Sequence, residues 1–374
     1  MTATLVQLTA DAAAVALKNA EANEHQRRIT DEVVRALKNI DVLRAYVPAV
    51  YGGPEYSPFE TMSTIEELSA ADGSTGWCAT IASLTSHIAG CLSAEAAAEI
   101  FGPADAAVCG AYAPSGRGTA RTDGSYDVTG RWAWGSGSSF ATWMTGGSVN
   151  DDGTARHMFF RTSDLTIHDT WDSNGLRATA SHDFSVYDVH VPAGHSVDLA
   201  AARPMVDAAI SRMPLFVLFS GGVASVMLGI AKRAMEELVL LAQTKKPVQS
   251  SKTLAQSSLA QVDIARAEAA VRSARAFLHE SVGEAWRRVQ LGDRVELETR
   301  LRARLAATHA GEQACAAVDL CYKAAGGSAV YATSPIQRCF RDVHTASAHV
   351  MVASRVYETI GRHRFGLEID RSSL

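Results

Sequence analysis

Residues 130–137 have the sequence Gly-Arg-Trp-Ala-Trp-Gly-Ser-Gly, and they lie in a part of the chain that differs from both flanks. Between residues 106 and 198, turn dipeptides such as Asp123-Gly124 separate short runs in which apolar and polar residues alternate. Alternation between turn signals is typical of β-strands. We therefore expect residues 106–200 to form a small antiparallel, β-barrel-like domain.

The segments on both sides of this domain have helical patterns. In residues 1–105, apolar side chains recur at three- and four-residue steps. Residues 201–374 contain long helical segments whose lengths suit an up-and-down four-helix bundle. We expect these helices at residues 221–243, 255–289, 295–325 and 342–360. The predicted fold class is α+β, with an N-terminal helical domain, a middle antiparallel β-domain and a C-terminal four-helix bundle.

The composition is that of a globular protein, with 47% hydrophobic and 20% charged residues among 374. The formal net charge of −5 and the pI of about 6.2 argue against a nucleic-acid partner, because phosphate backbones bind clustered Lys and Arg. Six cysteines without zinc-type spacing predict no metal site and a reducing, cytoplasmic location. The N-terminus lacks the basic segment of a signal peptide, and we expect no stretch that is apolar for long enough to span a membrane.

Four segments, in their order along the chain, resemble motifs of the acyl-CoA dehydrogenase superfamily. The first is a Pro-x-x-Tyr-Gly-Gly turn, and the second is a Gly-x-Trp-x-Trp-x-Ser-Gly stretch that resembles the superfamily's monooxygenase branch. The third is a Gly-Leu-Arg-x-Thr-x-Ser strand followed by Val-x-Val-Pro, and the fourth is a Gly-Gly pair followed by Pro-x-x-Arg-x-x-Arg-Asp. They lie within residues 47–53, 130–137, 175–192 and 326–342. The resemblance spans most of the chain and implies an acyl-CoA dehydrogenase-like architecture.

The fourth segment leads to a position where the dehydrogenase pattern is broken. Many dehydrogenases of the superfamily carry a glutamate base eight residues after the Arg-Asp pair, and Val350 stands there in this chain. Glu358 comes eight residues too late, although a dehydrogenase needs a base close to the α-proton of its substrate. His349 instead lies seven residues after Asp342. It resembles the histidine of the reduced-flavin monooxygenases that act on 4-hydroxyphenylacetate, dibenzothiophene and indole.

Resemblance to those monooxygenases implies the oxygenase component of a two-component system. A separate NAD(P)H-flavin reductase would supply reduced flavin, either FADH2 or FMNH2. Reaction of the flavin with O2 would give a C4a-hydroperoxide that hydroxylates a small aromatic or heteroaromatic substrate. The sequence contains no nicotinamide-binding fingerprint, which agrees with a separate reductase. The resemblance also implies a homotetramer formed through the C-terminal bundles.

The same resemblance assigns roles to individual residues. Ser136 and His349 are the expected catalytic residues. Ser136 would lie at flavin N5, in a turn whose glycines let the backbone approach a flat ring. His349 would handle protons, since histidine titrates near neutral pH. Trp134 would bind the cofactor beside Ser136, and Gly326 and Gly327 would meet the phosphate tail of the flavin.

Two other histidines have weaker assignments. His87, in the helix that follows Trp77, is the expected substrate-binding residue. His344 would lie about 140° from His349 on a continuous helix, so that both cannot point into one pocket, and we expect it to be structural. Local sequence alone also fits plainer interpretations, namely a β-turn at residues 135–137, core packing for Trp134 and a helix end at the two glycines.

Two alternatives to the monooxygenase hypothesis stay open. The first is a flavoprotein dehydrogenase or oxidase of the same fold, which would purify with tightly bound oxidised flavin. The second is a non-catalytic family member that only binds a partner or an acyl group. The presence of both Ser136 and His349 counts against the second alternative.

Overall fold

The computed structural model describes residues 4–248, 250–371 and 374. The contacts within the chain group it into two compact units. Unit 1 comprises the residues up to 61 together with 78–173 and 177–215, and unit 2 comprises 62–77, 174–176 and 216–374. The domain limits expected at residues 105/106 and 200/201 stay predictions.

Three helices of unit 1 start at hydroxyl-bearing capping residues. Thr4 and Gln7 form a capping box at the start of α1, Thr30 accepts a hydrogen bond from Val33, and Ser93 accepts one from Ala96. The helices are α1 (Leu5–Gln26), α2 (Asp31–Asn39), the unit 1 part of α4 (Gly73–Ser86), the 3-10 helix η3 (His87–Cys91) and α5 (Ala94–Phe101). The predicted helical character of this region is confirmed.

The sheet of unit 1 is mixed rather than purely antiparallel. Its seven described strands have the order β5-β6-β2-β1-β3-β4-β7. They are β1 (Val108–Ala120), β2 (Tyr126–Gly135), β3 (Trp143–Asn150), β4 (Ala155–Arg161), β5 (Thr166–His168), β6 (His182–Val191) and β7 (Ser196–Val197). Strands β1 and β3 are parallel, and the other described pairs are antiparallel. The expectation of an antiparallel sheet is therefore wrong at this pair. Strand β3 does not pair with β2, which precedes it in the chain, but lies on the other side of β1.

Trp132 occupies the centre of this sheet and explains the spacing of glycines around it. Its ring is fully buried, stacks on Phe184 with centroids 5.1 Å apart, and donates from Nε1 to the Gly147 oxygen at 2.7 Å. A Cβ at Gly116 or Gly130 would come within 2.6 Å of the indole, so a larger residue would displace it. The tryptophan thus fixes β2, whose last residue is Gly135, and with it the turn that follows.

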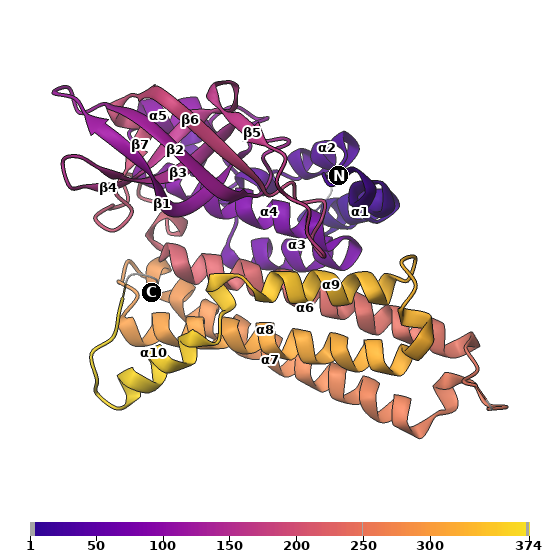
Figure 1. Cartoon of the computed structure of the whole chain (residues 1–374). Coiled ribbons are helices and arrows are strands. Elements are labelled where there is room, and N and C mark those ends of the chain that lie inside the picture. The colour runs from indigo at the N-terminus through magenta and orange to yellow at the C-terminus, as the bar shows by residue number, and fades with distance from the viewer. Residues whose placement is uncertain (1–3, 249, 372–373) are drawn as a thin grey trace. The chain divides into compact units, whose positions relative to one another are not determined.

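Unit 2 contains the longest of the described helices together with several shorter ones (Figure 1). They are α6 (Leu215–Thr244), α7 (Ser258–Gln290), α8 (Leu297–Ala325), α9 (Pro335–Ser347) and α10 (Arg355–Arg364), together with most of α3 (Pro58–Ala71). A Cβ at Gly229 of α6 would lie 2.3 Å from the Glu66 oxygen, which shows how closely α3 approaches α6. The helices expected at residues 221–243, 255–289 and 295–325 correspond to α6, α7 and α8.

The prediction of one continuous terminal helix over residues 342–360 is wrong. Helix α9 ends at Ser347, residues 350–352 form a short 3-10 helix, η9, and α10 starts at Arg355. The break carries His349, so the argument that placed His344 and His349 at an angle on one helix does not apply.

The expectation that no segment is long and apolar enough to span a membrane is also wrong. Within the described residues, α6 reaches the required length and hydropathy. However, 83% of its apolar window is buried inside the protein, as in the central helix of a bundle.

Candidate functional site

Ser136 lies in the turn directly after β2 and is buried. Its Oγ is 2.7 Å from the Oγ of Ser181, which is itself 2.7 Å from Oγ1 of Thr179. The backbone N–H of Gly137 donates to the Thr179 oxygen at 2.9 Å, which fastens the turn to this segment. The result is a chain of three hydroxyls in which each group can donate or accept. The sequence motif pointed to Ser136 but gave no role to Ser181 or Thr179.

Trp134 is held in an unusual backbone conformation next to Ser136. Its φ is +64°, and its O accepts a hydrogen bond from the Ser136 N–H at 2.9 Å. A non-glycine residue in the left-handed region is strained, and such residues cluster at functional sites. The side chain is 72% exposed, whereas Trp143 is only 6% exposed in a core cluster. Core packing therefore explains Trp143 and does not explain Trp134.

His87 lies at the start of η3 and is buried in unit 1. Its Nε2 donates to the Ile210 oxygen at 3.1 Å, and the ring packs edge-on against Tyr46 with centroids 6.4 Å apart. Burial lowers the pKa of His87 to about 4. The ring is therefore neutral at pH 7, and its expected contact with substrate stays a prediction.

His349 follows the end of α9 in an extended conformation, with φ −74° and ψ 136°. Its ring lies against Trp77 and Phe219, with centroids 5.4 and 5.3 Å away. The Nδ1 atom accepts a hydrogen bond from the Met351 N–H at 3.3 Å. In the neutral ring the proton is therefore on Nε2, since only one nitrogen carries it.

The electrostatics of His349 differ from the expectation of a group that titrates near neutral pH. Burial and then the charge of Arg304 lower the pKa of His349 to about 4. At pH 7 the ring is neutral and is a weak base. Its Nε2–H can donate a hydrogen bond, so the arrangement suits a donor better than a proton acceptor. His344, by contrast, is exposed, and its Nε2 lies 2.9 Å from Asp319.

Gly326 and Gly327 are exposed residues at the end of α8. Gly326 has a φ of +53°, its N–H bonds to carbonyls of the last helical turn, and the Lys245 ammonium bonds to the Ala325 oxygen. Helix termination accounts for Gly326, whereas a Cβ at Gly327 would meet no atom within 4 Å. Both glycines precede α9 and His349 follows it. The length of that 13-residue helix, about 20 Å, therefore separates them.

The Arg-x-x-Arg-Asp motif has a structural role that sequence alone did not reveal. Arg338 lies 2.5 Å from the fully buried carboxylate of Asp72, and Asp342 accepts a hydrogen bond from the Leu176 N–H at 2.6 Å. A Cβ at Gly175 would come within 2.2 Å of the Arg341 oxygen. These contacts tie α9 to the loop at residues 174–176 and to the residue before α4. They also fix the end of the helix from which His349 continues.

The expected site residues fall into two groups. Trp134, Ser136 and His87 belong to unit 1, where the first two form one turn. His349, Gly326 and Gly327 belong to unit 2. The described residues contain no cluster of three or more His, Cys, Asp or Glu side chains suited to a metal ion, and the six cysteines are free.

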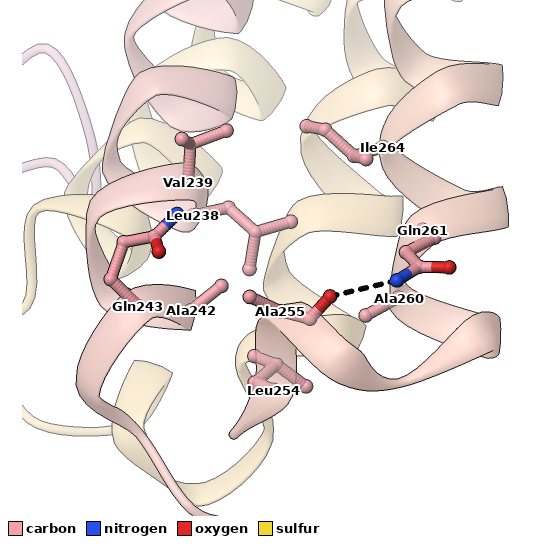
Figure 2. Close-up of a pocket in the computed structure, with 9 residues that line it drawn as sticks. All are labelled: Leu238, Val239, Ala242, Gln243, Leu254, Ala255, Ala260, Gln261 and Ile264. Atoms are coloured by element: carbon pink, nitrogen blue, oxygen red, sulfur yellow. Dashed lines mark hydrogen bonds between the residues drawn. The ribbon is translucent and has the colours of Figure 1, made fainter. Parts of the chain in front are cut away.

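A pocket in unit 2 lies where the end of α6 meets the start of α7 (Figure 2). Its polar side chains are two glutamines, and Gln261 donates to the Ala255 oxygen at 2.9 Å. The lining residues are Leu238, Val239, Ala242, Gln243, Leu254, Ala255, Ala260, Gln261 and Ile264. With no titratable lining residue, this pocket is unsuited to proton transfer.

Comparison with known proteins supports the same family along nearly the whole chain. Residues 4–101 match the family described as acyl-CoA dehydrogenase, N-terminal domain, and residues 221–354 match the one described as acyl-CoA dehydrogenase, C-terminal domain. An indole-3-acetate monooxygenase of Pseudomonas putida is 34% identical, over 92% of this chain and 89% of that protein. The flavin-dependent monooxygenase oxygenase subunit HsaA of Rhodococcus jostii (strain RHA1) is 28% identical, over 94% of this chain and 96% of that protein.

A solved structure agrees with the sequence relatives. XiaF from Streptomyces sp., in complex with FADH2 and glycerol, has a TM-score of 0.91 at 25% identity, over 99% of this chain and 97% of that one. The fold and the family predicted from the sequence are thereby confirmed. This chain belongs to the acyl-CoA dehydrogenase family and, within it, to the flavin-dependent monooxygenases.

Proposed function

We propose that this protein is the oxygenase component of a two-component monooxygenase, which uses reduced flavin and O2 to hydroxylate a small aromatic or heteroaromatic compound. The turn formed by Trp134 and Ser136 carries the proposal. It offers an exposed indole in a strained conformation beside a buried chain of hydroxyls. The relatives agree, because one acts on indole-3-acetate and another is named as an oxygenase subunit.

The residues of this turn fit a bound flavin. The exposed indole of Trp134 supplies a flat apolar surface against which a planar ring can stack. The similar protein of known structure was solved with FADH2, which favours FADH2 over FMNH2. When bound, the reduced flavin would supply the electrons that activate O2.

Each residue then has a proposed task. Ser136, with Ser181 and Thr179 behind it, would hold the proton at flavin N5, while Trp134 would keep water away from the ring. His349 would donate a hydrogen bond from Nε2 to an oxygen atom of the reaction, since its lowered pKa makes it a weak base. His87 would contact the substrate, and the exposed Gly327, with Gly326, would receive the phosphate tail of the flavin.

A dehydrogenase reaction has less support. The position of the dehydrogenase base is Val350, in η9, and Glu358 is an exposed residue of α10. A base for α-proton removal must approach the substrate within hydrogen-bond distance. We therefore favour oxygen transfer over dehydrogenation.

The proposal extends to partner, assembly and location. A separate NAD(P)H-flavin reductase would deliver the reduced flavin, in agreement with the oxygenase subunit among the relatives. The long helices would pair copies of the chain into a homotetramer, because Leu240 and Leu259 are exposed on α6 and α7. Six free cysteines agree with a cytoplasmic location. Sedimentation of the purified protein tests the tetramer directly.

Rapid mixing tests the reaction. Purified protein is mixed with anaerobically reduced FAD and then with oxygenated buffer, with and without indole-3-acetate as the probe substrate. We expect a transient near-ultraviolet absorbance to appear before the absorbance of oxidised flavin. When indole-3-acetate is present, we also expect a hydroxylated product. Direct reoxidation at the rate of free flavin would refute the proposal. A Ser136→Ala variant mixed in the same way tests the role of that hydroxyl. Ser125→Ala is its matched control, because Ser125 is also a buried serine but bonds to Asp123 in a distant turn.

A further inference from the structure

Arg304 is a buried cation in the helical interior of unit 2, with 1% of its surface exposed. Burial and then the nearby charge of Arg355 lower the pKa of Arg304 to about 10, and no acidic group of the described residues opposes them. Its Nε has no hydrogen-bond partner within the described part of the chain. Because burying an uncompensated charge is costly, the few contacts that this guanidinium makes are informative.

The contacts of Arg304 converge on one residue of the turn that carries His349. Its Nη1 donates to the Met351 oxygen at 2.9 Å and lies 3.1 Å from the Met351 sulfur. The N–H of the same Met351 donates to Nδ1 of His349 at 3.3 Å. The Val352 N–H also bonds back to the His349 oxygen at 3.1 Å. Both backbone polar groups of Met351 therefore have a partner: its carbonyl oxygen accepts from Arg304, and its N–H donates to His349.

Among the elements packed around the His349 imidazole, α8 supplies the charged side chain that affects its pKa, namely Arg304. Helix α6 contributes Phe219 and α4 contributes Trp77, neither of which is charged. Arg304 of α8 is the charged group that acts on the His349 ring, and Arg355 of α10 acts in turn on Arg304.

We propose that Arg304 is a positioning residue for His349. It holds the turn of residues 349–352 so that the Met351 N–H occupies Nδ1 and the proton of the neutral ring stays on Nε2. A neutral donor of hydrogen bonds, with fixed orientation, is the result. This inference rests on the proposed role of His349 in the reaction, but the position of the ring proton can be measured without turnover.

Three substitutions separate the donor of Arg304 from its charge. Arg304→Lys keeps both, Arg304→Gln keeps an N–H donor without the charge, and Arg304→Met removes both. Arg302→Met is the matched control, because Arg302 lies on the same helix and pairs with Glu284 nearer the surface. Nitrogen-15 NMR of labelled histidine rings reports which nitrogen carries the proton, and a His349→Gln sample identifies the signal.

We expect the wild-type protein and the lysine variant to show a proton on Nε2 alone at pH 7. The glutamine variant should keep this tautomer, while the pKa of His349 rises because the positive neighbour is gone. The methionine variant should give a mixture of tautomers. Its yield of product per flavin oxidised should fall on the order of ten- to a hundredfold, with the KM for substrate little changed. Arg302→Met should resemble the wild type in both measurements.

The positioning role of Arg304 and the reaction role of His349 are refuted by different results. A single Nε2–H tautomer in Arg304→Met, with unchanged product yield, would overturn the positioning role. If that variant does not fold, a mixed tautomer in Arg304→Gln would overturn it instead, because that side chain retains the donor. Unchanged hydroxylation by His349→Gln would overturn the proposed reaction role of His349, whatever the tautomer measurements show.

Discussion

Replacing Trp134 by glycine and by alanine separates the strain of its backbone from the function of its indole. A left-handed conformation costs a non-glycine residue about 1–2 kcal/mol, and glycine avoids this cost. Glycine loses about 0.5–1 kcal/mol through its greater freedom in the unfolded chain. Because φ at Trp134 is +64°, Trp134→Gly should be more stable than Trp134→Ala by about 0.5–1 kcal/mol, the reverse of the usual order.

Both variants should bind reduced flavin equally weakly. The indole is 72% exposed, and a planar ring stacked on one of its faces would cover about 70 Å² of it. At about 25 cal/mol per Å², the loss of this contact amounts to about 1.8 kcal/mol, or roughly a twentyfold increase in Kd. Trp134→Phe should fall between these variants and the wild type.

Urea unfolding and anaerobic titration with reduced FAD measure the two effects. Tyr187→Ala is the matched control, because this tyrosine is also an exposed aromatic residue of the same sheet. It should leave flavin affinity unchanged. A Trp134→Ala variant more stable than Trp134→Gly would refute the strain argument. Flavin affinity within twofold of the wild type in both variants would refute the stacking argument.

Three further predictions concern the hydroxyl chain, the histidine and the buried ion pair. Ser136→Ala should lower stability by about 1 kcal/mol, through loss of its hydrogen bond to Ser181, and should raise hydrogen peroxide at the expense of product; a peroxide assay beside product analysis checks this. His349 has a lowered pKa in the folded protein, so its contribution to stability is present above pH 6.5 and is lost as the pH falls towards 4. Urea unfolding measures the free energy of unfolding at pH 7.5 and at pH 5. When the pH is lowered between these values, His349→Gln should lose about 2 kcal/mol less of this free energy than the wild type. Equal losses would contradict the assigned pKa. Arg338→Met should lower the free energy of unfolding by about 3–5 kcal/mol, because it removes the cationic partner of the buried Asp72 carboxylate. Arg272→Met, at an exposed ion pair, should change it by less than about 1 kcal/mol, and similar losses in the two variants would contradict this account.

Sequence patterns predicted the order of helices and strands because that order depends on local periodicity and turn residues. The turn at Asp123-Gly124 does join β1 and β2, as such a dipeptide indicates. The parallel pairing of β1 with β3 was missed, since it depends on which non-local strands meet. Local residue types carry no information about that choice.

The roles of the expected site residues stay predictions, and the structure revealed local features of them that the sequence did not. Residues 343–350 contain neither glycine nor proline, so nothing in the sequence marks the end of α9 before His349. Tryptophan has no preference for a positive φ, and the strain at Trp134 was therefore invisible. The role of Arg304 depends on contacts 47 residues apart, which only the folded chain brings together.

The break between α9 and α10 has a consequence for how this family can change. In an uninterrupted helix, inserting or deleting one residue turns everything beyond it by about 100° and disrupts packing along the bundle. Here residues 348–354 form a connection between two separately anchored helices, with Asp342 fixing one side and Val356 packed in the core on the other. The connection can thus exchange one reactive side chain for another while the helices around it keep their register. The chemistry of this scaffold can then diverge through substitutions in this short connecting segment, without repacking of the bundle.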